Sequence, residues 1–406
     1  MAERMTEQQK TPSDLVNGTL LLRIIVLTIA GFLVMLAVPP RRVSGAEFNI
    51  QTGLSLSEEY TDNLFLTTTD RQQDYMTQAV PAVKLTYKTS LWDWALDYAY
   101  FARYYSGNKI TNDSTQTANL TNKTELISNT FFVALNDVYS RVSLNVARDY
   151  TQESTVVNQS DTNVVSVNPY IILKNTPSTS TVLGYQYVNT WYKDPTAIGT
   201  IEQTESVAVS TQLSSQTTFT TGVRYTQNMN NLVPFGKFDI YTGPSYTYAP
   251  NSYMFIILGN SLLDFDMTGQ TREHVSQAFW NAGITYQYST MAVSFTTALS
   301  YIPDPVEVVR RQDNYVVSLK KIAPTMTIQA SGGFTEYRNA EKNYIEDTTY
   351  SLSGSVIYAL SPRSTIDVGV SVEYLRDYQL ASATIQDVYL NHLRYEHKAL
   401  KNMTLA

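Results

Sequence analysis

The chain of 406 residues has no cysteine, only three histidines, and a charged fraction of 16%. The lack of cysteine excludes disulfide frameworks, zinc–thiolate sites and thiol nucleophiles, and it suits a chain that folds in an oxidising compartment without bridges. Imidazole chemistry is limited to His274, His392 and His397. The net charge of −7 argues against a nucleic-acid partner, which would need a basic surface.

Long apolar runs are also scarce, which excludes a bundle of membrane-spanning helices. The run Ile24–Val38 is typical of a signal peptide and shorter than the ~20 residues that a spanning helix needs. Ser44-Gly45-Ala46 then supplies small residues for cleavage. We predict a cleaved signal peptide over residues 1–46 and one mature domain over residues 47–406, with an uncleaved anchor as the alternative.

What the chain does have is aromatic residues, 30 of them tyrosine, and alternation of apolar and polar residues. Both features exclude intrinsic disorder. One apolar stripe consists of Met291, Val293, Phe295, Thr297, Leu299 and Tyr301, and another of Ile366, Val368, Val370, Val372 and Tyr374. Such runs are longer than the ~5–6 residues of soluble strands and match the ~9–11 of tilted membrane strands.

Short polar turns and longer polar loops separate the runs. The expected turns are Lys88–Ser90, Asn136–Asp137, Asn175–Pro177, Ser214–Ser215, Pro250–Asn251, Ser289–Thr290, Lys320–Lys321, Ser361–Arg363 and Ala399–Lys401. Expected loops include residues 59–77, 105–119, 149–163, 189–203, 261–274 and 338–347. This arrangement predicts an all-β fold, an antiparallel transmembrane outer-membrane β-barrel of about 18 strands with short periplasmic turns and long extracellular loops.

Two other repeat folds are alternatives to the barrel. A β-propeller has blades of about 40–45 residues, close to the spacing of the turns, but each blade needs four short strands where this chain has two long ones. A β-helix needs a much shorter repeat. Prolines at 81, 169 and 244 fall within expected strands, and because proline cannot donate to a ladder we expect bulges or locally opened ladders there.

Tyrosines close the apolar stripes at both ends. Tyr87, Tyr248, Tyr288 and Tyr358 lie next to turns, and Tyr104, Tyr225, Tyr301 and Tyr374 lie next to loops. Two aromatic girdles are typical of membrane barrels, because amphipathic rings favour the lipid–water boundary. A sugar-stacking path is the alternative, but it would need rings on the opposite side of the strands.

Charged residues fall on the side opposite the apolar stripes. The candidates for the lumen are Lys84, Asp93, Asp97, Arg103, Arg141, Arg224, Asp239, Asp367, Glu373 and Arg394. An Arg or Lys facing lipid at mid-depth would cost ~2–4 kcal/mol, so the lumen is the favoured side. Both signs occur in similar number, so these residues either solvate the lumen or select the solute.

The residue types needed for catalysis are not found together. Hydrolytic barrels need a serine–histidine pair or an Asp/His cluster near the outer rim. Glu273-His274 with Asp264 and Asp266 is a candidate ion site, and a solvated acidic loop is the simpler interpretation. We predict no enzyme, no catalytic residues, no cofactor and no resident metal.

Ser57-Glu58-Glu59-Tyr60-Thr61-Asp62-Asn63 after the first strand, the proline-containing strands and the turn Ser361-Pro362-Arg363-Ser364-Thr365 suggest a family. The chain resembles the outer-membrane β-barrel proteins associated with exosortase (PEP-CTERM) systems, porin-like barrels linked to exopolysaccharide genes. The resemblance covers residues 47–406 and implies a role at the cell surface or in polysaccharide export. It carries over no functional residue, and the end Met403–Ala406 lacks the terminal aromatic residue that usually closes the last strand of a barrel.

The sequence predicts a protein of the bacterial outer membrane, a porin-like channel for a hydrophilic solute or secreted polysaccharide. The alternative is a non-conducting surface barrel whose loops bind an envelope partner. Expected partners are outer-membrane lipid, the barrel-assembly machinery during insertion, and secreted polysaccharide or envelope export components, with no nucleic acid. For the end of the chain two hypotheses remain: closure of residues 387–397 onto 48–57, or a missing final hairpin.

Overall fold

The computed structural model describes residues 46–65, 70–107, 109–144, 159–230, 234–265, 273–302, 309–340, 342–378, 384–398 and 403–405. The expected signal peptide and the expected turn Ala399–Lys401 lie outside these residues and stay predictions. In the described part of the chain, no helix is long and apolar enough to cross a membrane.

The described residues form strands joined by turns and loops. The strands are β1 (Glu47–Thr61), β2 (Asp74–Lys88), β3 (Trp92–Tyr105), β4 (Asp113–Ile127), β5 (Phe131–Ser143), β6 (Gln159–Lys174), β7 (Thr179–Tyr192), β8 (Thr200–Gln212), β9 (Thr217–Asn230), β10 (Phe235–Ala249), β11 (Ser252–Phe265), β12 (Glu273–Tyr288), β13 (Met291–Ile302), β14 (Arg310–Ile322), β15 (Met326–Asn339), β16 (Ile345–Ser361), β17 (Ser364–Asp377), β18 (Thr384–Lys398) and the short β19 (Met403–Leu405).

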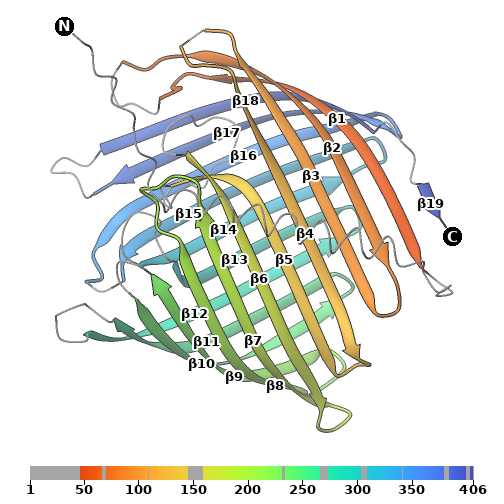
Figure 1. The fold of residues 1–406 in the computed structure, drawn as a ribbon, viewed down its shortest axis with the longest axis vertical. Helices are drawn as coiled ribbons and strands as arrows, with labels where there is room; N and C mark the ends of the chain where they lie inside the picture. The colour runs from red at the N-terminus through yellow and green to blue at the C-terminus, as the bar shows by residue number, and fades with distance from the viewer. Residues whose placement is uncertain are drawn as a thin grey trace, which may run out of the picture. The chain divides into compact units, whose positions relative to one another are not determined.

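The long strands close into one antiparallel barrel. Each strand pairs with its neighbours in sequence, and β1 pairs with both β2 and β18, which lie on either side of it (Figure 1). Gly53–Thr61 of β1 faces Leu390–Lys398 of β18, and Phe48–Ile50 faces β19. The predicted barrel of about 18 strands is therefore confirmed, and the propeller and β-helix alternatives are wrong. Closure of the last long strand onto the first is also confirmed, with Gly53–Thr61 as the paired segment in place of residues 48–57. A missing final hairpin is not required, since β1 has a partner on both sides.

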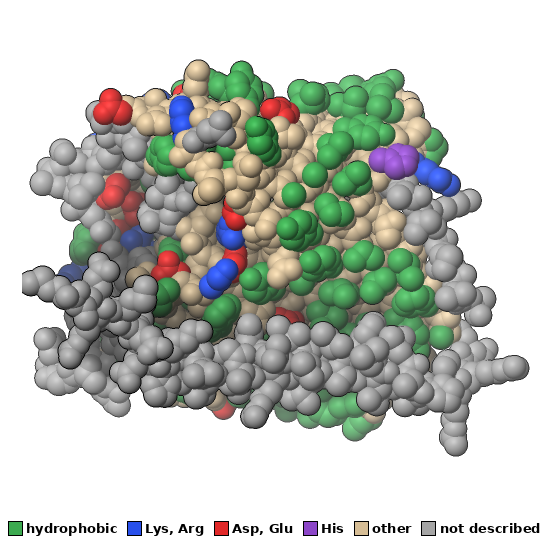
Figure 2. Space-filling model, turned by 45° about the horizontal axis from the view of Figure 1, so that its top comes forward, with side chains coloured by type: hydrophobic (Ala, Val, Ile, Leu, Met, Phe, Trp, Pro, Cys, Tyr) green, Lys and Arg blue, Asp and Glu red, His purple; other side chains and the backbone are tan. Residues whose placement is uncertain are grey.

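The outward side of the wall is apolar. Exposed side chains on it include Leu54, Leu258, Val317, Leu352, Val368 and Leu393. Hydrophobic side chains run in oblique rows that follow the tilted strands (Figure 2). So large an exposed apolar surface on a closed barrel is stable only in lipid, where the backbone groups are already satisfied by the ladders. The chain is an outer-membrane protein, as its sequence predicts.

Two expected turns were misplaced. Asn136–Asp137 lies inside β5, and the turn is Ser128–Thr130, where Asn129 has φ 53°. Lys320–Lys321 lies inside β14, and the turn follows Ile322 at Pro324. The chain reverses where asparagine adopts positive φ or where proline removes a ladder donor, and polar residues inside a strand do not reverse it.

The three strand prolines open their ladders locally, as predicted. Pairing between β2 and β3 skips Val80 and Pro81, pairing between β6 and β7 skips Asn168 and Pro169, and pairing between β10 and β11 skips Gly243 and Pro244. The register is the same on both sides of each gap, so these are openings and not bulges. A Cβ at Gly243 would lie 1.8 Å from the Ile256 carbonyl oxygen, which explains glycine at this close approach.

Candidate functional site

The inward side of the wall is polar, and it is the candidate site. All of the predicted lumen residues except Arg141 lie on the side of their strands opposite the exposed apolar residues. These inward residues are Lys84, Asp93, Asp97, Arg103, Arg224, Asp239, Asp367, Glu373 and Arg394. Arg141 lies on the same side of β5 as Leu135 and Tyr139, and its position is explained below. Their role in solute passage stays a prediction.

Near the turns, inward charges form solvated cross-strand pairs. Lys84 Nζ lies 3.0 Å from Asp97 Oδ1, and Lys88 Nζ lies 3.7 Å from Asp93 Oδ2. The side chains are 46% and 47% exposed in the first pair, and 66% and 57% in the second. Pairs this exposed contribute little to stability. Their exposure shows that this half of the lumen has room for water.

Near the loops, the inward side chains are buried. Asp239 has 1% side-chain exposure and accepts hydrogen bonds from Arg224 Nε at 2.9 Å and Nη2 at 2.7 Å. Ser261 donates to Asp239 at 2.7 Å, and Lys237 Nζ lies 3.5 Å away. This carboxylate is fully compensated, as a buried charge must be. It fixes the guanidinium of Arg224, which is 42% exposed to the lumen.

A second buried ion cluster joins β14 to the start of β16. Arg310 Nη1 donates to Asp347 Oδ2 at 2.7 Å, and Arg310 Nε lies 3.2 Å from Glu346 Oε2. All three side chains are at most 7% exposed. The strand pairing is irregular between Tyr337 and Arg338, which brings two consecutive acids to one arginine.

The wall folds inward where β12 and β13 separate. They pair only between Asn281–Tyr288 and Ala298–Met291. Beyond that point Tyr301, although on the outward side of β13, donates to Gln277 Oε1 of β12 at 2.8 Å. Lys237 of β10 lies 5.7 Å from the Tyr301 ring centre. Contact with inward residues of β12 and β10 requires the end of β13 to lie inside the barrel, so the assignment of Tyr301 to the aromatic girdle was wrong.

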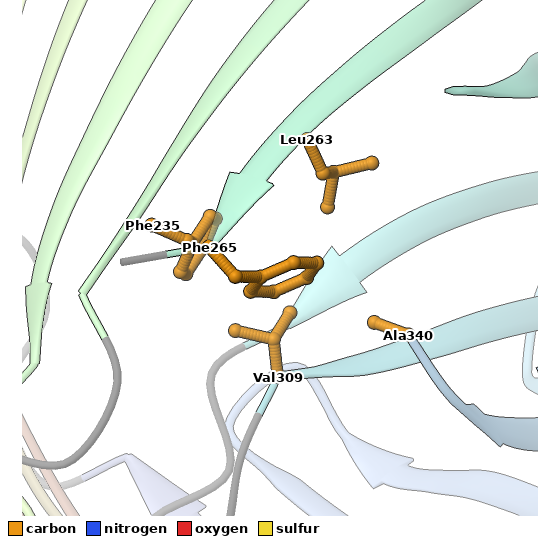
Figure 3. Close-up of a cluster of buried hydrophobic side chains, with 5 residues drawn as sticks. All are labelled: Phe235, Leu263, Phe265, Val309 and Ala340. Atoms are coloured by element: carbon orange, nitrogen blue, oxygen red, sulfur yellow. The ribbon is translucent and has the colours of Figure 1, made fainter. Parts of the chain in front are cut away.

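Apolar residues anchor this inward end. Phe235, Leu263 and Phe265, from β10 and β11, pack with Val309 before β14 and Ala340 after β15 (Figure 3). All five side chains are at most 4% exposed. We call the ends of β13, β14 and β15, with Val309 and Ala340, the β13–β15 tip. Because each fully buried apolar side chain contributes roughly 1.5–3 kcal/mol, this cluster holds the tip against the wall.

A similar break separates β4 from β5. Their pairing stops at Ala118 and Tyr139. Past it Arg141 contacts Asp113, an inward residue of β4, and donates to Asp161 at 2.9 Å. Lys193 adds an ion pair to Asp161 at 3.2 Å. We call the loop-side ends of β5, β6 and β7 the β5–β7 tip; the break explains why Arg141 reaches the inner side from the outward face.

The two tips narrow the lumen at its loop side. The breaks lie between β4 and β5 and between β12 and β13, nearly opposite each other in the ring of strands. Buried polar residues gather at this side on other strands too, among them Glu59, Asp74, Gln78, Arg103, Asn228 and Asp347. No local sequence signal marks the tips, because alternation reports the side of a strand and not where its ladder stops.

The described residues offer little for catalysis or metal binding. Within them, no group of three or more His, Asp or Glu side chains is arranged to hold a metal. His274 Nδ1 lies 3.6 Å from Asp264, and both side chains are well exposed, at 73% and 42%. Ser364 Oγ lies 2.9 Å from His397 Nδ1 at the turn side, and no described carboxylate orients that histidine as a nucleophile's base would require.

Comparisons with known proteins find similarity in architecture. No protein-family model matches the chain, and no curated protein matches it. Solved structures with a similar strand arrangement include Pseudomonas aeruginosa OpdQ (9% identity, 88% of this chain and 99% of that one, TM-score 0.46). Pseudomonas aeruginosa OccK5 (OpdH) is 8% identical over 90% of this chain and 99% of that one, with a TM-score of 0.47. Acinetobacter baumannii OccAB2 is 9% identical over 88% and 98%, also at 0.47.

Proposed function

We propose that this chain is a passive outer-membrane channel for hydrophilic solutes, and not an enzyme. The observation that carries the proposal is the solvated inward surface near the turns, where Lys84, Lys88, Asp93 and Asp97 are about half exposed or more. A barrel of this strand number encloses more space than its own side chains fill. Inward charges of both signs then keep the enclosed space aqueous.

The constriction between the two tips sets the size and charge of what passes. Arg224 faces the lumen on β9, held by Asp239, and Arg141 and Lys193 lie on the β5–β7 tip. Charged side chains at a narrow point act on a solute more strongly than those in a wide vestibule, because little water screens them. Solute selection is therefore assigned to the loop side of the lumen.

The test is single-channel conductance of the purified full chain in planar bilayers. Discrete, ohmic openings support the channel, and a folded barrel that never conducts supports a non-conducting surface barrel that binds an envelope partner. A specific observation favours that second candidate: an apolar cluster and buried ion pairs occupy the inner side of the wall at its loop end. The Val309→Asp variant distinguishes the two candidates further. A charge in the apolar cluster should release the β13–β15 tip and increase the conductance of a channel.

We further propose that the solute is a secreted polysaccharide and that the barrel serves an exosortase system. This narrower proposal rests on the sequence resemblance. Its support in the chain is the segment Ser57–Asn63. Liposome swelling with sugars of increasing length measures the size limit directly. Entry of oligosaccharides supports the glycan path, and a limit near monosaccharides contradicts it while leaving the small-solute channel intact.

A further inference from the structure

Glu205 is a carboxylate on the apolar, outward side of the wall. Its ladder partners are Tyr185 on β7 and Tyr225 on β9, and Val207 is the next outward residue on β8. These three neighbours are 37%, 45% and 41% exposed. Among the described residues, Glu205 has no hydrogen-bond or ion-pair partner. Tyr225 belongs to the expected girdle at the loop side, so Glu205 lies level with the edge of the lipid. An acid without a partner among exposed apolar side chains there favours a contact with another protein group.

The surface around Glu205 is hollow. A groove of about 460 Å³ extends from β5 to β10, and its outward lining includes Ile171, Leu183, Val223 and Phe238. Pro169, where the β6–β7 ladder is open, also borders the groove. A concave apolar surface with one carboxylate fits a protein side chain better than disordered lipid tails, because protein interfaces supply both packing and a hydrogen-bond donor.

Other polar side chains share this outward arc. Asp137 lies between Leu120 and Val165 of the neighbouring strands and accepts a hydrogen bond of 2.8 Å from the Asn163 amide. Gln203 is the outward residue next to Glu205 on β8. By contrast, Leu352, Val368 and Leu393 on β16, β17 and β18 are 64%, 51% and 54% exposed. Outward polar residues also occur elsewhere on the wall, among them Glu58 on β1 and Asn391 on β18. The apolar groove around Glu205 is therefore what distinguishes the arc of β5 to β8.

We propose that the outward face of β5 to β8, carrying Asp137, Asn163, Gln203, Glu205 and Tyr185, binds a second copy of this chain within the membrane. Asn163 and Asp137 bond to each other within one copy. The bonds across the interface therefore use Glu205 as the acceptor, and the Gln203 amide and the Tyr185 phenol as donors. A two-fold axis through β8, close to Glu205, would bring the carboxylate of each copy to the donors of the other, because a two-fold interface pairs the same patch on both copies. The pair of barrels removes Glu205 from lipid and fills both grooves. This inference needs membrane insertion and does not rest on conduction.

The first test measures association. The full chain is reconstituted in nanodiscs wide enough for two barrels and its mass is determined, with the folded state checked by heat-modifiable migration on gels. We expect dimers, and we expect Glu205→Leu to lower the association constant by about tenfold, the scale of one lost polar contact in a membrane. Glu58→Leu is the matched control, since Glu58 is an outward acid on β1, far from this face, bonded to Thr77 at 2.7 Å.

The second test locates the interface. Because the chain has no cysteine, single-cysteine variants are unambiguous. Val207→Cys in vesicles at low protein density should give an oxidised dimer, whereas Val368→Cys on the opposite arc should not. A monomeric mass for the unsubstituted chain overturns the proposal, because a lipid or another protein would then have to cover Glu205. Equal cross-linking at the two positions overturns it as well, since it indicates random collision.

Discussion

Tyr301 and Gln277 are joined by a hydrogen bond of 2.8 Å, although Tyr301 lies on the outward side of β13 and Gln277 on the inward side of β12. Neighbouring strands of an unbroken wall cannot bring opposite sides together. The contact exists because the β12–β13 ladder ends at Asn281 and Ala298, which frees the end of β13 to lie inside the barrel. The lumen is consequently narrowed by its own strands.

The apolar cluster should control both stability and pore size. Phe265 is 1% exposed, and Phe265→Ala should destabilise the barrel by about 3–5 kcal/mol, with larger conductance as the β13–β15 tip loosens. Urea unfolding in detergent and single-channel recording measure the two effects. Phe295→Ala is the control, because Phe295 is 39% exposed on the outward side and should change neither much. Equal effects of the two substitutions would mean that the cluster does not hold the tip.

Asp239 should matter more than any exposed acid of the lumen. Asp239→Asn leaves Arg224 and Lys237 without their shared carboxylate and should cost about 1–3 kcal/mol of unfolding free energy. Asp97→Asn removes a pair that is about half exposed and should cost at most about 1 kcal/mol. Denaturant unfolding of both variants checks the difference. The importance of Asp239 is refuted if the two variants unfold at the same denaturant concentration.

Chemical labelling measures which side of the barrel wall a residue faces. Cysteine at Asp367 or Arg224 should react with a membrane-impermeant reagent in the reconstituted barrel, because both lie on the inward side. Cysteine at Val368 or Phe295 should be protected by lipid. Reaction at Val368 with protection at Asp367 would require a register shifted by one residue, which exchanges the two sides of a strand.

The signal peptide also has a direct test. If residues 1–46 are removed on export, the protein purified from outer membranes should begin at Glu47 and migrate in a heat-dependent way. Mass spectrometry of the intact chain measures this. A mass that includes the run Ile24–Val38 would instead support the uncleaved anchor.

The sequence by itself determined that the chain forms a barrel of about 18 strands. It also determined which side chains of each strand face outward and which face inward. Alternation with period two carries that information, because successive side chains of a strand point to opposite sides and lipid tolerates only apolar ones. Prolines 81, 169 and 244 also predicted the local openings, because proline has no N–H to donate to the ladder on that side of the strand.

Only the tertiary structure decided where ladders stop and what the strand ends then touch. Tyr301 and Arg141 follow their apolar stripes in sequence, yet they contact Gln277 and Asp113 on the inner side. The burial of Asp239 beside Arg224, and the exposure of Glu205 on the outer wall, likewise depend on neighbours from other strands. Alternation describes one strand at a time. A constriction or an interface is formed by contacts between strands that are far apart in sequence, so no single strand predicts it.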